Sequence, residues 1–113
     1  MIEEGKRTGE FLISEGEGAI SRDKVMLKKR AAVYEAGTIL GKVDATGLYK
    51  AHDPAATDGS QTAAGVLYET VDASAADTPA VAIVRLAEVD GTLLVGDVDA
   101  ARDDLAANFV IVR

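Results

Sequence analysis

Several residue types that carry chemistry or stability in small proteins are scarce in this chain of 113 residues. It has no cysteine, which excludes disulfides, thiolate nucleophiles and thiolate metal ligands. It has no tryptophan, and three Tyr and two Phe leave little aromatic material for a core. The hydrophobic fraction of 48% is rich in alanine, with 20 Ala against 29 Val, Ile, Leu and Phe together. We therefore expect a thin core and a chain that gains stability from association.

Long apolar runs and an excess of basic residues are also missing. No run approaches the roughly 20 apolar residues of a membrane span, and the N-terminal MIEEGKRTGE is too charged for a secretory signal. We expect a soluble protein with no membrane partner. The net charge of −7 comes from residues 51–113, which hold 3 basic and 11 acidic residues, against 9 and 8 in residues 1–50. This balance argues against direct nucleic-acid binding, which needs a basic face.

The one basic cluster is RDKVMLKKR, residues 22–30. Two interpretations are open. Lysines commonly protect the edge strand of a sheet, so the cluster is typical of a solvated strand edge. Alternatively, Lys28, Lys29 and Arg30 form a contact surface for an acidic partner.

The N-terminal residues 1–20 predict a flexible arm, since they are rich in Gly and Glu and show no helical period. One apolar triplet, Phe11, Leu12 and Ile13, interrupts them. In an extended chain, Phe11 and Ile13 would share one face and Leu12 would lie on the other. The triplet either folds back onto the core of its own domain, residues 21–113, or binds the surface of another molecule.

The remaining residues predict short strands, bounded by turns, and one helix. Val25 and Leu27 open a strand; further strands are expected over the ranges 37–44, 46–53, 65–74, 80–89 and 109–113. Residues 37–53 are typical of a hairpin. Residues 80–89 are apolar on both alternating faces, which favours a central strand. Residues 99–109 predict a helix capped by Asp97 or Asp99, with Ala101, Leu105 and Phe109 on one face. The sequence thus predicts a small, mainly β or β-rich α+β barrel with one short C-terminal helix.

Catalytic and metal-binding patterns are weak. His52, Asp53 and Ser60 lie close in sequence, but no nucleophile-elbow pattern accompanies them. The acids of residues 97–104 fail the calcium-loop spacing and favour a charged helix N-terminus instead. The three glycines of residues 37–47 lack phosphate-loop spacing. We therefore expect no cofactor, no metal and no enzymatic activity.

The order of the segments resembles the head decoration protein family of tailed phages. The resemblance is carried by EFLISEGEGAISRDKV, AGTILGKV, DGSQTAAGVLYETVDAS and PAVAIVRLAEVD, followed by the helix and the terminal strand. Its most specific piece is DGSQTAAGVLY leading into VDAS. It spans roughly residues 8–113 and implies a β-tulip-like fold.

The resemblance also implies a function. Members of this family are non-enzymatic homotrimers that sit on the outer surface of the expanded head and bind major capsid protein subunits. A virion protein made in the host cytoplasm is therefore expected. On this view Phe11, Leu12 and Ile13 belong to an arm strand that adds to a capsid sheet edge, and Lys28, Lys29 and Arg30 face the shell. The alternative from another class is a small monomeric β-barrel that binds or carries a ligand.

Overall fold

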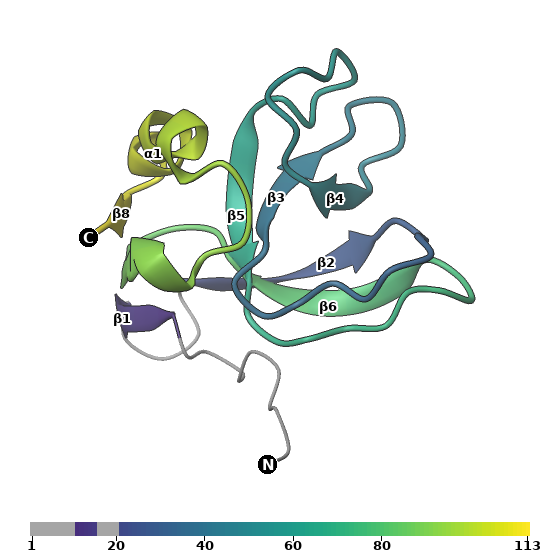
Figure 1. Ribbon diagram of the computed structural model, residues 1–113, viewed down its shortest axis with the longest axis horizontal. Coiled ribbons are helices and arrows are strands. Elements are labelled where there is room, and N and C mark those ends of the chain that lie inside the picture. The colour runs from purple at the N-terminus through teal and green to yellow at the C-terminus, as the bar shows by residue number, and fades with distance from the viewer. Residues whose placement is uncertain (1–10, 16–20) are drawn as a thin grey trace.

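A closed five-stranded barrel lies beside a smaller three-stranded sheet in the computed structural model, which describes residues 11–15 and 21–113 (Figure 1). The barrel has the order β2-β4-β3-β5-β6 and the small sheet the order β1-β7-β8. The barrel strands are β2 (Arg22–Leu27), β3 (Ile39–Lys42), β4 (Tyr49–Ala51), β5 (Ala63–Leu67) and β6 (Thr78–Ile83). The other elements are β1 (Leu12–Glu15), β7 (Ala87–Val89), the 3₁₀ helix η1 (Gly91–Leu93), α1 (Val98–Ala107) and β8 (Val110–Val112). The predicted mainly-β barrel with one short C-terminal helix is confirmed.

The predicted hairpin of residues 37–53 is confirmed as the antiparallel pair β3 and β4, with Leu40 opposite Ala51. Gly47, in the turn between them, has φ +72°, a conformation that glycine adopts readily. Strand β3 also pairs with β5, and β5 pairs with β6. The hairpin is therefore built into the middle of the barrel wall.

The middle strands of the barrel bury both faces. On β5, Val66 faces one apolar cluster and Leu67 the other; on β6, Ile83 and Ala82 divide in the same way. One cluster lies between the barrel and the small sheet with its helix: Phe11, Ile39, Ala63, Val66, Ile83, Ala87, Val89, Leu94, Ala101, Leu105, Val110 and Val112. The other comprises Val25, Leu27, Tyr34, Leu40, Leu67, Ala73, Ala80 and Ala82. Seven of the 21 buried apolar residues in the described part are alanines, so the core is as thin as predicted.

The prediction of one continuous strand over residues 80–89 is wrong. The chain leaves the barrel after β6 and enters the small sheet as β7, and Leu86 between them has φ +53°. This left-handed conformation is incompatible with a regular strand. Because of this break, the apolar residues 80–89 contribute to β6 in the barrel and to β7 in the small sheet.

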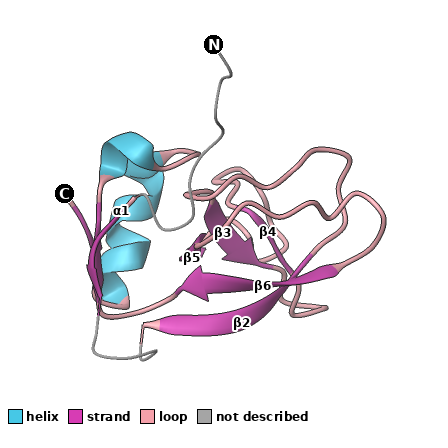
Figure 2. Ribbon diagram, turned by 90° about the horizontal axis from the view of Figure 1, so that it is seen from below, coloured by secondary structure: helices cyan, strands magenta, loops and turns pink. Residues whose placement is uncertain are grey.

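Helix α1 is confirmed near its predicted position, and Asp97 caps it by accepting a hydrogen bond from the Ala100 N–H at 3.0 Å. Ala101 and Leu105 are buried as predicted. Phe109 is not on this face: it lies beyond the helix, with φ +61°, and is largely exposed. The chain reverses there to enter β8, which pairs in parallel with β7. Helix α1 packs beside β8 and β5 (Figure 2).

Two further predictions are corrected by strand pairing. The strand expected over residues 65–74 begins earlier and ends at Leu67. The strand-edge interpretation of residues 22–30 is corrected only in part: β2 closes the barrel by meeting β4 where Leu27 lies opposite Tyr49, whereas the rest of β2 pairs among the described strands with β6 alone. In the described ranges, we find no helix of the length and apolarity that a membrane crossing requires.

Candidate functional site

The N-terminal triplet divides between the core and the surface. Phe11 is 1% exposed and belongs to the core, and its carbonyl accepts a hydrogen bond from the Asp90 N–H at 2.7 Å. Leu12 is partly buried against the same cluster, whereas Ile13 is 53% exposed. The prediction that Phe11 and Ile13 share a face is wrong, because Phe11 precedes β1 and the register shifts between Leu12 and Ser14. Phe11 and Leu12 therefore pack on their own domain in the isolated chain.

Strand β1 forms one edge of the small sheet, in antiparallel pairing with β7. On the side of this sheet opposite the buried Ala87 and Val89, Glu88 is held by two hydrogen bonds. Ser14 Oγ donates to Glu88 Oε1 at 3.2 Å, and Arg113 Nε donates to Glu88 Oε2 at 2.6 Å. The Arg113 and Ser14 hydrogen bonds keep the pKa of Glu88 below its ordinary value. The carboxylate of this face is thus neutralised within the subunit.

The three basic residues at the end of β2 have different roles. Lys28 and Lys29 are exposed beyond the strand. Arg30 stacks on Tyr34, with its guanidinium carbon 3.8 Å from the ring centre, and donates to the carbonyls of Ala32 and Val33. Arg30 therefore fixes its own loop, while Lys28 and Lys29 present their ammonium groups outward.

These residues line a groove of about 360 Å³, together with Tyr34, Lys50, Ala51, His52 and Asp53. Lys50 is paired with Asp58 at 2.8 Å, an interaction that raises the pKa of Lys50 and lowers that of Asp58. Lys28, Lys29 and Arg30 supply the remaining positive charge of the groove, and Asp53 contributes one carboxylate. The groove is suited to an acidic surface of a partner.

The residues weighed for catalysis have separate structural partners. His52 is 8% exposed, and its Nε2 lies 3.0 Å from the Gln61 carbonyl; its Nδ1 is buried without a hydrogen-bond partner among the described residues. Ser60 Oγ donates to Asp58 at 2.6 Å, and the Asp53 N–H donates to the Ser60 carbonyl. His52, Asp53 and Ser60 therefore hold the loop after β4 and form no catalytic relay.

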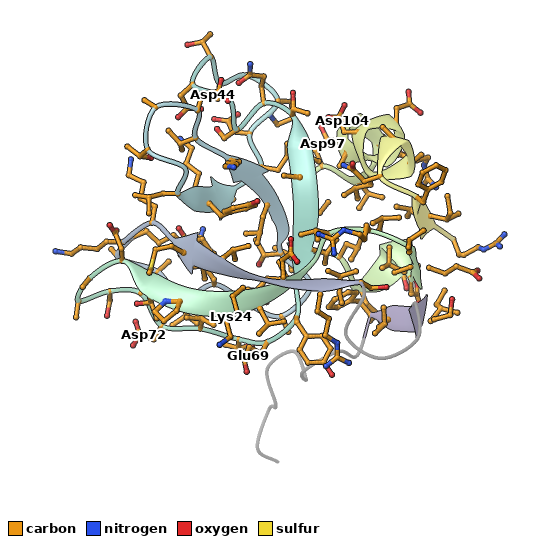
Figure 3. The ribbon with its side chains drawn as sticks, turned by 180° about the vertical axis from the view of Figure 1, so that it is seen from behind. Lys24, Asp44, Glu69, Asp72, Asp97 and Asp104 are labelled. Atoms are coloured by element: carbon orange, nitrogen blue, oxygen red, sulfur yellow. The ribbon has the colours of Figure 1, made fainter. Side chains whose placement is uncertain are left out.

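The acidic residues before and along α1 also have structural roles. Asp97 caps the helix, as predicted, and Asp104 accepts a hydrogen bond from the Ala63 N–H at 3.0 Å (Figure 3). Within residues 11–15 and 21–113, no group of three or more His, Asp or Glu is arranged to hold a metal ion.

Two exposed apolar residues were missed by the sequence analysis. Leu86 lies between β6 and β7, and Phe109 lies between α1 and β8. Both had been assigned to a buried stripe of a regular element. For Phe109, the available signal was the small number of residues between the helix and the last strand. So short a connection requires a residue of unusual backbone conformation after the helix C-cap.

The described residues thus form a small, mainly β protein that combines a closed barrel with a three-stranded sheet. The family model of the bacteriophage lambda head decoration protein D matches residues 1–110. The chain therefore belongs to this head decoration protein family, a family of structural phage capsid proteins and not of enzymes. Searches of curated proteins and of solved structures gave no match.

Proposed function

We propose that this protein is a cementing protein, which trimerises on the outer surface of the phage head and stabilises the expanded capsid by binding major capsid protein subunits. The observation that carries the proposal is the family match over residues 1–110, which supports capsid decoration. The trimer, the capsid partner and the mode of attachment go beyond that match. The structure supports them at three places.

The first is the edge strand β1. A partner strand that added beside it would extend the small sheet by backbone hydrogen bonds, with alternate side chains setting the register. Phe11 and Leu12 fix β1 to its own domain, and Ile13 remains exposed on the strand. We assign the apolar capsid contact of the predicted triplet to Ile13, with Phe11 and Leu12 positioning it.

The second is the groove lined by Lys28 and Lys29, which would bind an acidic surface of the shell. Arg30 contributes by holding the adjoining loop against Tyr34. Charge pairs at the rim of an interface raise the association rate more than the final affinity. This contact would therefore guide the protein to its site.

The third is the alanine-rich core. A fold that buries so much alanine gains stability when subunit contacts bury further area. Attachment of three linked subunits to one site also raises avidity without a strong single contact. The monomeric ligand carrier instead requires an apolar cavity with a few convergent polar groups, whereas the groove at Lys28 and Lys29 is lined mainly by polar and charged side chains.

The test is binding of the full chain to decoration-free heads assembled from the major capsid protein of the same phage. Ile13→Ser should weaken co-sedimentation with the heads about tenfold and leave the melting temperature unchanged, because Ile13 is 53% exposed. A chain that begins at Phe11 provides a second variant that keeps the core residue in place. Full-length protein that neither self-associates at micromolar concentration nor binds heads would refute the proposal.

A further inference from the structure

Leu86 and Phe109 combine two unfavourable properties. Both have left-handed backbone conformations, with φ +53° and +61°. Both also expose large apolar side chains, by 44% and 65%. Glycine or asparagine adopts this conformation readily, whereas leucine and phenylalanine do so rarely.

The two residues are neighbours across the small sheet. The Leu86 N–H donates to the Asn108 carbonyl at 3.2 Å, and the Ala87 N–H donates to the Phe109 carbonyl at 3.0 Å. These bonds continue the parallel pairing of β7 and β8, in which Glu88 lies opposite Ile111.

The two strands define one exposed side of the sheet. The buried residues Ala87, Val89, Val110 and Val112 face the core, so by alternation Glu88 on β7 and Ile111 on β8 lie on the opposite side. Leu86 and Phe109 directly precede these strands and are exposed, and their left-handed backbones interrupt the alternation. We call the surface formed by Leu86, Glu88, Phe109 and Ile111 the outer face. Arg113 neutralises Glu88 on this side of the sheet, and Ser14 donates a hydrogen bond to it.

Stability of the fold does not explain why large apolar residues occupy these exposed, left-handed positions. Backbone conformations that cost stability persist where the surrounding structure imposes them and are concentrated at functional sites. Here the strained residues are also exposed and apolar, and they lie next to each other. The described residues leave these side chains exposed, and contact with another molecule would bury them.

We propose that the outer face docks against the major capsid protein, with Leu86 and Phe109 as its apolar anchors. This inference rests on the proposed function. The outer face continues into β1, the edge strand that the proposed function places against the shell. The occupant that we assign is the major capsid subunit, because the family match over residues 1–110 supports attachment of this chain to a phage capsid.

The test replaces each anchor by asparagine, which tolerates the left-handed conformation. Leu86→Asn and Phe109→Asn, singly and together, should leave the melting temperature equal or higher, because strain is relieved. They should leave self-association in sedimentation unchanged. Binding to decoration-free heads should fall about tenfold or more for the double variant. The control is Met26→Gln, which removes an apolar side chain of similar exposure (42%) from barrel strand β2 and should bind as the unchanged protein does.

Any other result contradicts either this inference or the proposed function on which it rests. Undiminished head binding by the double variant, with normal binding by the unchanged protein, would dismiss the anchors and leave the proposed function intact. Loss of self-association would show that the outer face binds a second copy. If the melting temperature falls with asparagine and falls again when glycine replaces both residues, the Leu86 and Phe109 side chains stabilise the fold. Failure of the unchanged protein to bind heads would instead refute the proposed function.

Discussion

The Asp104 carboxylate on α1 accepts a hydrogen bond from the backbone N–H of Ala63 at the start of β5, at 3.0 Å. The two residues are 41 positions apart, and the bond ties the helix to the barrel wall. Ala63 is buried and Asp104 is half-buried, so the N–H would lose its partner if the carboxylate were removed. Buried backbone donors without partners are costly.

Asp104→Ala should therefore lower the free energy of unfolding by about 1–2 kcal/mol. Asp103→Ala is the matched control, since Asp103 is an exposed neighbour on the same helix and its loss should cost less than about 0.5 kcal/mol. Urea denaturation of both variants measures the difference. Equal effects would mean that helix charge, and not the bond to Ala63, accounts for the role of Asp104.

Gly41 on β3 predicts a steric effect. A Cβ at this position would lie 2.4 Å from the Ser60 carbonyl oxygen and 2.6 Å from the Ser60 Cα. Because both atoms belong to the backbone, the loop after β4 would have to move. Gly41→Ala should destabilise the fold by about 1–3 kcal/mol, measured by thermal or urea unfolding. An unchanged unfolding midpoint would show that this loop adapts without cost.

Asp58 predicts how stability depends on pH. Hydrogen bonds from Lys50 and from the Ser60 hydroxyl and N–H hold the pKa of Asp58 well below its usual range. A carboxyl with a lowered folded-state pKa contributes stability above its unfolded pKa of about 4, and this contribution is lost as pH falls toward the folded value. Asp58→Asn should therefore be less stable at neutral pH and lose less on acidification below about pH 4. Parallel stability curves for the two proteins would contradict this expectation.

The basic groove predicts separable effects of its residues. Reversing the charge of Lys28 and Lys29 to Glu should weaken head binding several-fold at low salt, with a smaller effect at high salt, and should leave stability unchanged. Arg30→Ala should mainly lower stability, by about 1 kcal/mol, because its guanidinium stacks on Tyr34 and bonds to the Ala32 and Val33 carbonyls. Binding titrations at two salt concentrations, with melting curves, separate the two roles. Salt-independent binding by the charge-reversed variant would dismiss the electrostatic contact.

Local sequence patterns predicted the parts of the fold that local physics determines. The alternation at Val25 and Leu27 identified β2, and Asp97 with Ala101 and Leu105 identified the capped, amphipathic helix. A hydrophobic period reports which residues are buried within one element. The barrel class followed from the number and spacing of such elements.

The small sheet could not be predicted in the same way. It pairs β1 and β8, near opposite ends of the chain, with β7 between them, and no local pattern encodes such a partnership. Leu86 and Phe109 have left-handed backbone conformations although neither is glycine or asparagine, so the residue type at these positions does not indicate a change of chain direction. Phe11, surrounded by glycines and glutamates, gave no local indication that it belongs to the core. The function followed from the order of segments, because a docking surface has no motif comparable to that of a catalytic site.

The position of β8 also sets an order of events during synthesis. The barrel strands lie between Arg22 and Ile83, so a ribosome exposes them all before β8 at Val110–Val112 emerges. The three-stranded sheet needs that last strand, since β8 pairs directly with β7. A prematurely terminated chain could therefore assemble barrel strands yet would lack the complete surface that we propose engages the shell. Folding of the barrel and completion of the small sheet can therefore be separate in time, because β7 gains its partner β8 only after all barrel strands have been synthesised.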